Sequence, residues 1–385
     1  MKRRKTVAEF FAGIGLMRMG LERAGWHVVW ANDIDEDKMR MYRGHYSDDN
    51  AHFHLGDVHA LDYSSIPTVA LATASFPCND LSLAGARRGL AGQQSGAFWG
   101  FVEALKGMRL HRPPLVLLEN VAGFLTSHNG NDFRKACLAL NELGYVVDAL
   151  LIDAANFVPQ SRQRLFLVGK KEVRKTVIIS EPPMFYESEY RPRALADFIL
   201  RNPGICWSLR DLPPISKKQL PLSSFIDDLP PSSPYWWSTQ RAEYLLNQMS
   251  DKHRHIAEGM IKGKDFSYGT VFRRVRHGRS MAELRTDGIA GCLRTPRGGS
   301  GRQILFKAGK GRYSVRLLTP KECARLMGAD DFTITGTLNQ SLFGFGDAVC
   351  VPVIQWIAEN YLNPVWKESY ASETQEKQYR EQTAG

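Results

Sequence analysis

The sequence lacks the cysteine spacing of a metal site or of a disulfide framework. Six of its 385 residues are cysteine, and no two of them form a C-x-x-C pair. They are Cys78, Cys137, Cys206, Cys292, Cys323 and Cys350. Zinc sites need clustered ligands, and disulfide scaffolds need many closely spaced cysteines. We therefore predict reduced thiols, most of them in the core, and no metal.

Long apolar runs and internal repeats are missing as well. No stretch approaches the roughly 18 consecutive apolar residues of a membrane-spanning helix. The first five residues resemble the basic start of a signal peptide, but Glu9 and Gly13 follow where its apolar segment would lie. We therefore predict a cytoplasmic protein without a membrane partner. We also expect it to be a monomer.

Positive charge is what the sequence has in excess. Its 50 lysines and arginines outnumber 40 acidic residues, which gives a formal net charge of +10. Hydrophobic residues make up 43% and charged residues 23%, as in a folded globular chain, and the length favours two domains. A basic balance is typical of proteins that bind nucleic acids, although many basic proteins bind none.

Apolar runs and helical patterns alternate through the first 170 residues. We expect strands at 6–11, 27–32, 69–75, 115–119, 145–152 and 164–169, and helices at 16–24, 36–46 and 132–143. Such alternation is typical of a parallel α/β sheet. After about residue 170 the chain is rich in proline, serine and tryptophan, and later in arginine and glycine, which indicates an irregular second domain.

Helical patterns return towards the end of the chain, at 319–327 and 351–360. Thr319, Pro320 and Glu322 have the spacing of a helix N-terminus, with a capping residue, a first-turn proline and an acid three residues after the cap. The segment from residue 366 onward is polar, and we expect it to be frayed.

A glycine turn follows the first predicted strand and opens the first helix. Gly13 and Gly15 let the backbone approach a ligand at the carboxyl edge of the sheet. The next glycine is Gly20, so the spacing is not G-x-G-x-x-G, which argues against a dinucleotide and its pyrophosphate. Asp33 and Asp57 follow later segments and could accept from ribose hydroxyls and an adenine amine. The pattern fits adenosine without phosphates, as in S-adenosylmethionine; a tight turn with surface acids fits equally well.

A cysteine lies just past a buried strand, in Ser75-Phe76-Pro77-Cys78-Asn79. Active-site residues collect at that edge of a sheet, and Pro77 restricts the backbone before the thiol. A lone cysteine is more commonly buried in the core, but the polar loop that follows Cys78 argues against a core position here.

An acid and two arginines follow other predicted strands. Glu119 comes after four apolar residues, where it either starts a helix or serves a site. Arg162 and Arg164 are two residues apart, so in a strand they point to one face. Paired arginines are more often solvated surface than functional groups.

Taken in order, these segments resemble the DNA cytosine-5 methyltransferase family of bacterial and phage restriction-modification systems. The blocks that carry the resemblance are Phe11-Ala12-Gly13-Ile14-Gly15, Asn32-Asp33, Gly56-Asp57-Val58, Phe76-Pro77-Cys78, Glu119-Asn120-Val121, Gln160-x-Arg162-x-Arg164, the run from Arg316 to Leu326, and Gly346-Asp347-Ala348-Val349. They occur in family order and span residues 7 to 360.

The resemblance implies an architecture. We expect the mixed, Rossmann-like sheet of S-adenosylmethionine-dependent methyltransferases, with a smaller, irregular target-recognition domain. Residues 1–170 and 345–366 would form the catalytic domain, 171–344 the recognition domain and 367–385 a polar tail. The last helix, within 346–360, should return to pack near Phe11.

It also implies a mechanism. The Cys78 thiolate would add to C6 of a flipped-out cytosine, which makes C5 able to take the methyl group of S-adenosylmethionine and leaves S-adenosylhomocysteine. Glu119 would favour protonation at N3, and Arg162 and Arg164 would supply the cationic neighbourhood that a thiolate needs. Loss of the C5 proton and of Cys78 would release the product.

Binding residues follow by position. The methyl donor would contact Phe11, Gly13, Gly15, Asp33, Ile34, Asp57, Val58, Pro77 and Asp347. Double-stranded DNA would contact Ser82, Arg87 and Arg88 in the loop after Cys78, Gln160, and Arg294, Arg297 and Arg302 in the recognition region. Three residues depart from the family pattern: Ile34 replaces a common tryptophan, Asn79 a common glutamine and Asp347 the usual asparagine. By family habit a restriction endonuclease would be a separate partner chain.

Two alternatives stay open beside this one. A branch of the family of similar length methylates tRNA, but its Cys-Phe-Thr signature is missing here. A non-catalytic DNA-binding protein could use the same scaffold, although Cys78, Glu119 and Arg162 are all intact. A nicotinamide-linked dehydrogenase fails on the glycine spacing.

Overall fold

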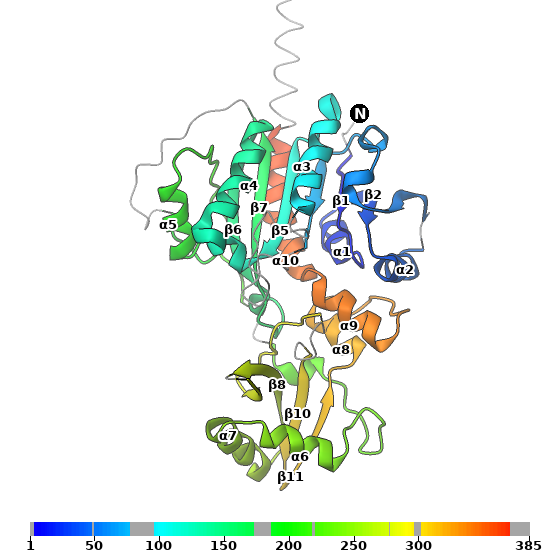
Figure 1. Ribbon diagram of the computed structural model, residues 1–385, viewed down its shortest axis with the longest axis vertical. Coiled ribbons are helices and arrows are strands. Elements are labelled where there is room, and N and C mark those ends of the chain that lie inside the picture. The colour runs from blue at the N-terminus through cyan, green and yellow to red at the C-terminus, as the bar shows by residue number, and fades with distance from the viewer. Residues whose placement is uncertain are drawn as a thin grey trace, which may run out of the picture.

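The computed structural model describes residues 4–47, 50–77, 96–172, 186–217, 220–276, 278–295 and 302–369. The strands of this described part form one sheet of seven strands and one of four. Figure 1 shows the larger sheet with its helices in the upper part of the molecule and the smaller sheet in the lower part. Between them lie α8 (Pro320–Leu326) and α9 (Leu338–Asp347).

The larger sheet has the strand order β3-β2-β1-β4-β5-β7-β6. Its members are β1 (Thr6–Phe10), β2 (His27–Asp33), β3 (Phe53–Leu55), β4 (Leu71–Ala74), β5 (Leu115–Val121), β6 (Tyr145–Asp153) and β7 (Gln163–Lys171). All six strands predicted from the sequence are present, with only small differences at their ends.

This sheet is mixed, because β7 runs antiparallel to both of its neighbours, β5 and β6. The other neighbouring strands are parallel. The connection from β6 to β7, residues 154–162, is too short for the crossover helix that parallel strands require. The parallel sheet expected from strand–helix alternation was therefore wrong at β7, while the mixed sheet implied by the family resemblance is confirmed.

Helices cover both faces of the larger sheet. They are α1 (Leu16–Arg23), α2 (Glu36–His45), α3 (Ala97–Gly107), α4 (Asn131–Glu142), α5 (Arg193–Arg201) and α10 (Val351–Ile357). Side chains of α1 and α10 share one core cluster with Val7 and Leu71 of the sheet. Side chains of α3, α4 and α5 share another with Ala8 and Ala72, which directly follow Val7 and Leu71 in their strands. The alternation of side chains along the strands thus separates two helical layers.

The smaller sheet has the order β11-β10-β8-β9 and is antiparallel. Its strands are β8 (Ser267–Arg276), β9 (Arg279–Arg285), β10 (Ile304–Gly309) and β11 (Arg312–Leu317), and α6 (Thr239–Asn247) and α7 (Asp251–Lys262) cover one face. The irregular second domain expected from composition therefore contains a regular sheet. Composition did not reveal it because arginine and glycine occur within the strands as well as in the connections, as in β8.

Residues 186–212 pack with the larger sheet, although the predicted boundary at 171 would assign them to recognition. Leu195 and Ile199 of α5 are buried in the core cluster of α3 and α4. Trp207, 1% exposed, lies in the same cluster and forms a bridge to Val147 of β6. This segment extends the edge of the larger sheet before the chain crosses to the smaller one.

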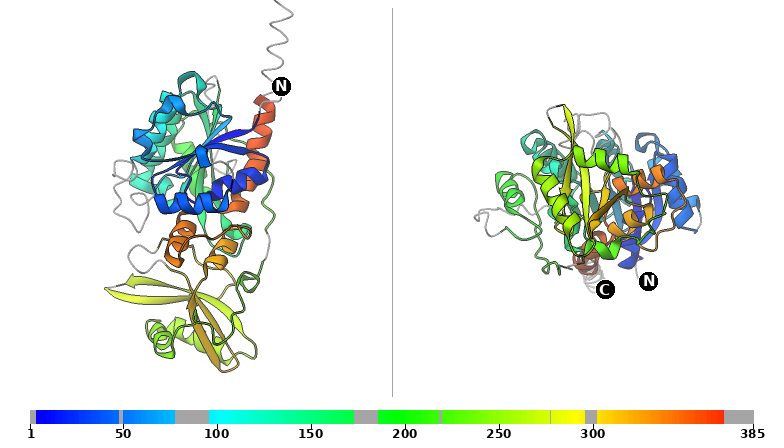
Figure 2. Two further views of the ribbon diagram at one scale, coloured as in Figure 1. Left: turned by 90° about the vertical axis from the view of Figure 1, so that its right-hand side faces the viewer. Right: turned by 90° about the horizontal axis from the view of Figure 1, so that it is seen from below.

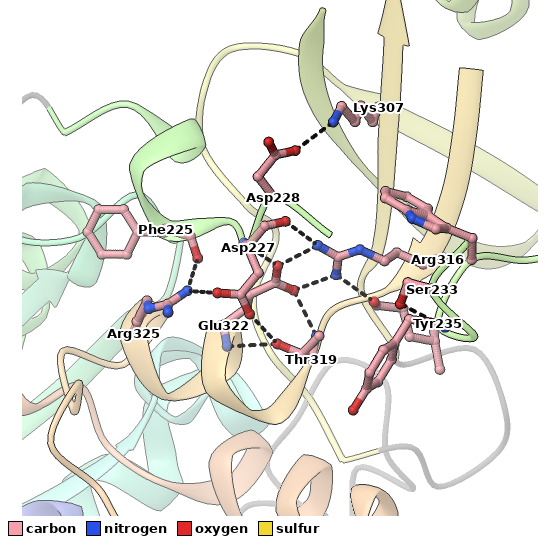
Figure 3. A network of polar contacts seen from close by, with 12 residues as sticks. Phe225, Asp227, Asp228, Ser233, Tyr235, Lys307, Arg316, Thr319, Glu322 and Arg325 are labelled. Carbon is pink, nitrogen blue, oxygen red and sulfur yellow. Dashed lines mark hydrogen bonds and ion pairs between the residues drawn. The ribbon is translucent and has the colours of Figure 1, made fainter. Parts of the chain in front are cut away.

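A buried ion-pair network joins the smaller sheet to α8 (Figure 3). Arg316 of β11 donates from Nη1 to Glu322 Oε2 at 2.6 Å, and both side chains are fully buried. Asp227 takes part through its backbone N–H, which donates to Glu322, and through its carboxylate, which accepts from Arg325 at 2.6 Å. Thr319 and Glu322 also form the predicted capping box of α8. The network fixes the orientation of β11 relative to α8.

The last helical stretch, Leu338–Ser369, is long and apolar enough to cross a membrane by length and composition. However, 61% of its most apolar window is buried inside the protein. Gly20 of α1 lies so close to Ile354 of α10 that a Cβ at position 20 would be 2.6 Å from the Ile354 Cβ. Trp366 packs against Trp26, with ring centroids 6.0 Å apart, so the fraying expected from residue 366 was wrong as far as Ser369. This stretch is a core element of the larger sheet's helical layer.

Candidate active site

A pocket of about 450 Å³ lies at the carboxyl ends of β1, β2, β4 and β5. We call it the central pocket. It occurs where the strand order reverses, since β2 lies on one side of β1 and β4 on the other. The predicted site residues that line it are Phe11, Gly13, Asp33, Ile34, Asp57, Val58, Pro77, Glu119, Arg162, Arg164 and Asp347. The structure thus brings together residues that lie more than 330 positions apart in the sequence.

The glycine turn has the conformation that its residues suggest. Gly13 and Gly15 have φ values of +57° and +87°, in the left-handed region that glycine adopts without strain. Phe11 also has a positive φ, 56°, and lines the pocket. At Gly15 a Cβ would lie 2.5 Å from the ring of Tyr46, so packing as well as φ requires glycine there. Gly15 itself does not line the pocket. It packs against Tyr46 and thereby supports the turn that does.

Asp33 is bound to the turn itself. Its Oδ2 accepts from the Gly13 backbone N–H at 2.8 Å, and its Oδ1 accepts from Asp35 N at 2.9 Å. Burial raises the pKa of this carboxyl above its ordinary value, against the opposing effect of Lys38 and these backbone N–H groups. Asp33 therefore fixes the position of the glycine turn at the end of β2.

Other residues predicted to contact the methyl donor also line the central pocket. Asp57 caps a short 3₁₀ turn by accepting from His59 N at 3.0 Å. Val58 beside it is buried, whereas Ile34 is 69% exposed at the rim. An exposed aliphatic side chain on the wall of a pocket is suited to packing against a planar, apolar face of a ligand.

Lys38 of α2 is a lining residue that sequence reasoning missed. Its Nζ lies 2.7 Å from Asp347 Oδ2, which joins α2 to the end of α9. Burial alone would lower the pKa of Lys38, but the carboxylates of Asp347 and Asp33 outweigh it and raise that pKa. No sequence pattern indicates this pair, because its members are 309 residues apart.

Cys78 lies outside the described residues, but the segment that leads to it is described. Phe76 is 3% exposed, and its backbone carbonyl accepts from Asn120 Nδ2 at 3.1 Å. Pro77, the residue before the cysteine, lines the central pocket. The end of β5 therefore holds Phe76 and Pro77, the two residues before the cysteine, at the wall of the pocket.

Glu119 and Arg164 form a buried ion pair at this wall. Arg164 Nε lies 2.9 Å from Glu119 Oε1, and the two side chains are 15% and 7% exposed. The pairing of β5 with β7 brings these residues to neighbouring positions, with Arg164 opposite Val121. Burial raises the pKa of Glu119, and the charges of Arg164 and then Arg162 partly offset that rise. A carboxyl with a raised pKa is better able to hold or donate a proton near neutral pH.

Arg162 donates to backbone carbonyls from both of its terminal nitrogens. Its guanidinium donates to Leu293 O at 2.7 Å, to Gly346 O at 3.0 Å and to Ala348 O at 2.5 Å. The side chain is 2% exposed, and burial lowers its pKa, with further lowering from Arg164. Arg162 thus joins three segments: the start of β7, the 290–295 loop and the end of α9.

Cys292 is a second thiol near these arginines. Its Sγ lies 3.3 Å from Arg162 Nη1. Burial on its own would raise the pKa of Cys292, but the charges of Arg162, Arg164 and Arg294 bring it below its ordinary value. No motif in the sequence marked this cysteine.

The predicted DNA contacts have different outcomes. Gln160 is fully buried; its amide donates to Leu326 O at 2.7 Å and its Oε1 accepts from Leu293 N at 3.0 Å. Gln160 therefore links the end of α8 to the 290–295 loop, and its burial does not fit the direct DNA contact expected from the sequence. Arg294 is exposed, and Arg302 donates to Asn339 at 2.8 Å. Ser82, Arg87, Arg88 and Arg297 lie outside the described residues.

Comparison with known proteins identifies this arrangement. The model of the C-5 cytosine-specific DNA methylase family matches residues 5–363, nearly the whole chain. The chain belongs to this family. The resemblance noted from the sequence is thereby confirmed, and the protein is a DNA cytosine methyltransferase with a DNA substrate.

Individual relatives agree with the family model. The type II methyltransferase M.DsaV of Dactylococcopsis salina is 27% identical over 365 residues, which cover 94% of this chain and 87% of that protein. A DNA-cytosine methyltransferase of Escherichia coli K12 is 26% identical, with 96% and 80% covered. The solved structure of Schizosaccharomyces pombe Dnmt2 methyltransferase superposes with a TM-score of 0.61 at 16% identity, covering 94% of this methyltransferase and 99% of that chain, which shows the fold.

Proposed function

We propose that this methyltransferase adds Cys78 to C6 of a cytosine flipped out of duplex DNA and transfers a methyl group from S-adenosylmethionine to C5. The observation that carries the proposal is the continuity of the central pocket. The glycine turn and Asp33 line one end, and Glu119, Arg164 and Pro77 line the other. A methyl donor and a cytosine can therefore occupy adjoining halves of one cavity.

The residues present fit S-adenosylmethionine. The pocket volume of about 450 Å³ is that of a typical small-molecule site. Asp57 and the rim residue Ile34 suit an adenine, which needs an acceptor for its amine and an apolar wall. Lys38, the lysine among the described lining residues, is neutralised by Asp347, as suits a ligand without pyrophosphate. When bound, S-adenosylmethionine would supply an electrophilic methyl group.

The chain's own groups account for the remaining steps. The Cys78 thiolate attacks C6, and the electron pair moves towards N3, where the Glu119 carboxyl supplies a proton. C5 then has enamine character and takes the methyl group. Loss of the C5 proton to a base allows the Cys78–C6 bond to break and N3 to return its proton. Arg164 holds Glu119 in place. We assign Arg162 a positioning role, since both of its terminal nitrogens donate to carbonyls.

Base flipping follows from the geometry of the substrate. C6 of a stacked cytosine is covered by its neighbours, so the base must leave the helix at a cost of a few kcal/mol. Glu119 is 6% exposed at the pocket wall, where only an extrahelical base could meet it.

Transfer of labelled methyl groups tests the proposal. Purified protein with tritiated S-adenosylmethionine should label duplex DNA, and nucleoside analysis should find the label in 5-methylcytosine. Cys78→Ala should abolish the signal, whereas the matched control Cys206→Ala, at the far edge of the sheet, should retain it. Methylation of tRNA but not of duplex DNA, or label transfer by Cys78→Ala, would contradict the proposal.

We further propose that the protein is the protective methylase of a restriction-modification system. Support comes from relatives whose names mark them as type II methyltransferases. Plasmid DNA from cells that express the chain should resist one type II endonuclease in a panel, at sites that bisulfite sequencing shows to be methylated. Methylation spread over all cytosines, without a short common sequence, would contradict this role.

A further inference from the structure

A basic ribbon projects from the smaller sheet. β8 pairs with β10 only through Ser267–Val271, whereas its pairing with β9 continues to Arg276 opposite Arg279. Residues 272–276 and 279–283 therefore form a two-stranded ribbon beyond the body of the sheet, and Figure 2 shows it extending away from the rest of the molecule. A two-stranded ribbon contributes little to stability by itself.

The two faces of this hairpin differ sharply. Val271, Ala282 and Leu284 lie on the face that packs against α6 and α7, and all three are buried. Because side chains alternate along strands, the opposite face carries Arg274, Arg276, Arg279 and Arg285. We call this the arginine face. Arg276 and Arg279 are directly opposite each other, an arrangement of like charges that costs stability.

Carboxylates neutralise only part of this charge. Arg276 pairs with Glu283 at 2.9 Å, and Arg285 pairs with Asp287 at 2.7 Å. Within the described residues no carboxylate lies at ion-pair distance from Arg274 or Arg279, and both are exposed. Beyond Val271 both strands of the ribbon are edges, and charged side chains on an edge also prevent sheets from associating. These arginines, however, gather on one face of the ribbon. The pattern is that of a surface that meets an anion.

The register shows which way this face points. Arg285 is opposite Thr270, Thr270 is opposite Leu305, and Leu305 is opposite Arg316. Directly opposed residues share a face. Arg316 binds Glu322 of α8 (Figure 3), so this face of the sheet is turned towards the larger sheet and its central pocket. The arginine face of the ribbon continues the same face beyond the part that α8 covers.

We propose that Arg274, Arg276 and Arg279 bind backbone phosphates of the DNA duplex to one side of the cytosine under reaction. The inference rests on the proposed function and adds to it a DNA contact that lies away from the reacting base. A row of exposed arginines on a projecting ribbon matches a polyanion in charge, and it faces the side from which DNA must approach the pocket. Such contacts position the duplex without reading its sequence.

Salt dependence of DNA binding tests the ribbon directly. The probe is a mixed-sequence duplex of about 40 base pairs, roughly four helical turns, in fluorescence anisotropy titrations. Each phosphate contact adds about 0.9 to the slope of log K against log salt, so Arg274→Gln/Arg279→Gln should flatten that slope by about 1.8. Between about 50 and 200 mM salt the parent should then lose about twelvefold more affinity than the variant.

Two further variants separate the explanations. Lys252→Gln/Lys262→Gln removes the same charge from α7, which lies on the side of the smaller sheet opposite the arginine face. This control should leave the slope unchanged. Arg274→Lys/Arg279→Lys should keep the slope, because the slope depends on the positive charges that neutralise phosphates, and lysine keeps them. Circular dichroism and melting temperature verify folding of each variant.

The outcomes are distinguishable from a failure of the proposed function. A parent that methylates duplex DNA while the glutamine variant keeps the parental slope overturns the ribbon contact alone. An equal loss of slope in the α7 control also overturns it, since the effect would then be bulk charge. A lysine variant that methylates different sequences would make the ribbon a base reader and overturn the phosphate assignment. A parent that transfers no methyl group to duplex DNA contradicts the proposed function instead.

Discussion

The Glu119 carboxylate lies 2.9 Å from Arg164 Nε at the wall of the central pocket. Both residues come from adjacent antiparallel strands, β5 and β7, and so share a rigid support. The pair explains how an acid can be buried at a reaction centre and still be held in one orientation. Its electrostatics lead to a direct test.

Replacing Arg164 should raise the pKa of Glu119 further. Burial already raises this pKa, and the positive charge of Arg164 is the largest influence that lowers it. In Arg164→Gln that influence is gone, so the carboxyl should keep its proton to higher pH. Carbon-13 NMR of labelled glutamate side chains measures the pKa of Glu119 in the parent and in Arg164→Gln. The spectrum of Glu119→Gln identifies its resonance. An unchanged or lower titration midpoint in Arg164→Gln would show that the ion pair does not control Glu119.

Arg162→Lys should destabilise the fold although it keeps the charge. Lysine cannot reproduce the planar set of bonds to Leu293 O, Gly346 O and Ala348 O, and one lost charged hydrogen bond costs about 1.5–3 kcal/mol. Urea unfolding should report at least that decrease, with weaker DNA binding. Arg294→Lys, at an exposed position of the same loop, is the matched control. Unchanged stability with slower thiol addition would mean that Arg162 acts on the Cys78 thiolate itself.

Glu9 should make stability fall as pH rises. This residue of β1 is 1% exposed, and burial raises its pKa from 4.5 to about 8. The folded state therefore holds a proton that the unfolded state has released between these values. The free energy of unfolding should drop by about 1.4 kcal/mol per pH unit across that window, and the contribution is lost once pH exceeds about 8. Below pH 4.5 it is fully present.

Urea unfolding of Glu9→Gln at several pH values measures this contribution. The variant should show a flatter dependence than the parent between pH 5 and 8, because glutamine binds no proton. Glu142→Gln, at an exposed position of α4, should behave as the parent does. Parallel curves for the parent and Glu9→Gln would refute a titrating Glu9.

Asp347→Asn should weaken binding of S-adenosylmethionine. The substitution restores the usual family residue, but it leaves the Lys38 ammonium without its carboxylate at the pocket wall. Without the Asp347 charge Lys38 is less completely neutralised, and it repels the positively charged sulfonium. For a partly exposed pair the effect is about 1 kcal/mol, or about fivefold in Kd by calorimetry. The double variant Lys38→Gln/Asp347→Asn, which has no such charge, should recover most of the affinity. No change in Asp347→Asn would separate this pair from donor binding.

The sequence predicts best what local pattern determines. The strands, the glycine turn and the Thr319 cap were all predictable, because each depends on residues a few positions apart. The antiparallel β7 was also within reach, since its connection to β6 is short. Ordered motifs were enough to bring Asp33, Glu119 and Arg164 to one pocket.

The rest depends on contacts between distant segments. Lys38 meets Asp347 across 309 positions, and Arg162 meets Gly346 across 184. Gln160 looked like a surface residue within its own motif, yet the α8 end and the 290–295 loop bury it. Local pattern contains no information on which segments cover a side chain, so these roles required the structure.

Covalent trapping of Cys78 tests the central claim most directly. A duplex whose target cytosine has fluorine at C5 cannot lose that substituent as a proton, so the bond from Cys78 to C6 should persist after methyl transfer. Peptide mass spectrometry should find the methylated fluorocytosine on Cys78 in the parent and no adduct in Cys78→Ala. An adduct on another cysteine, such as Cys292, or complete methylation of the DNA without any adduct, would contradict the account.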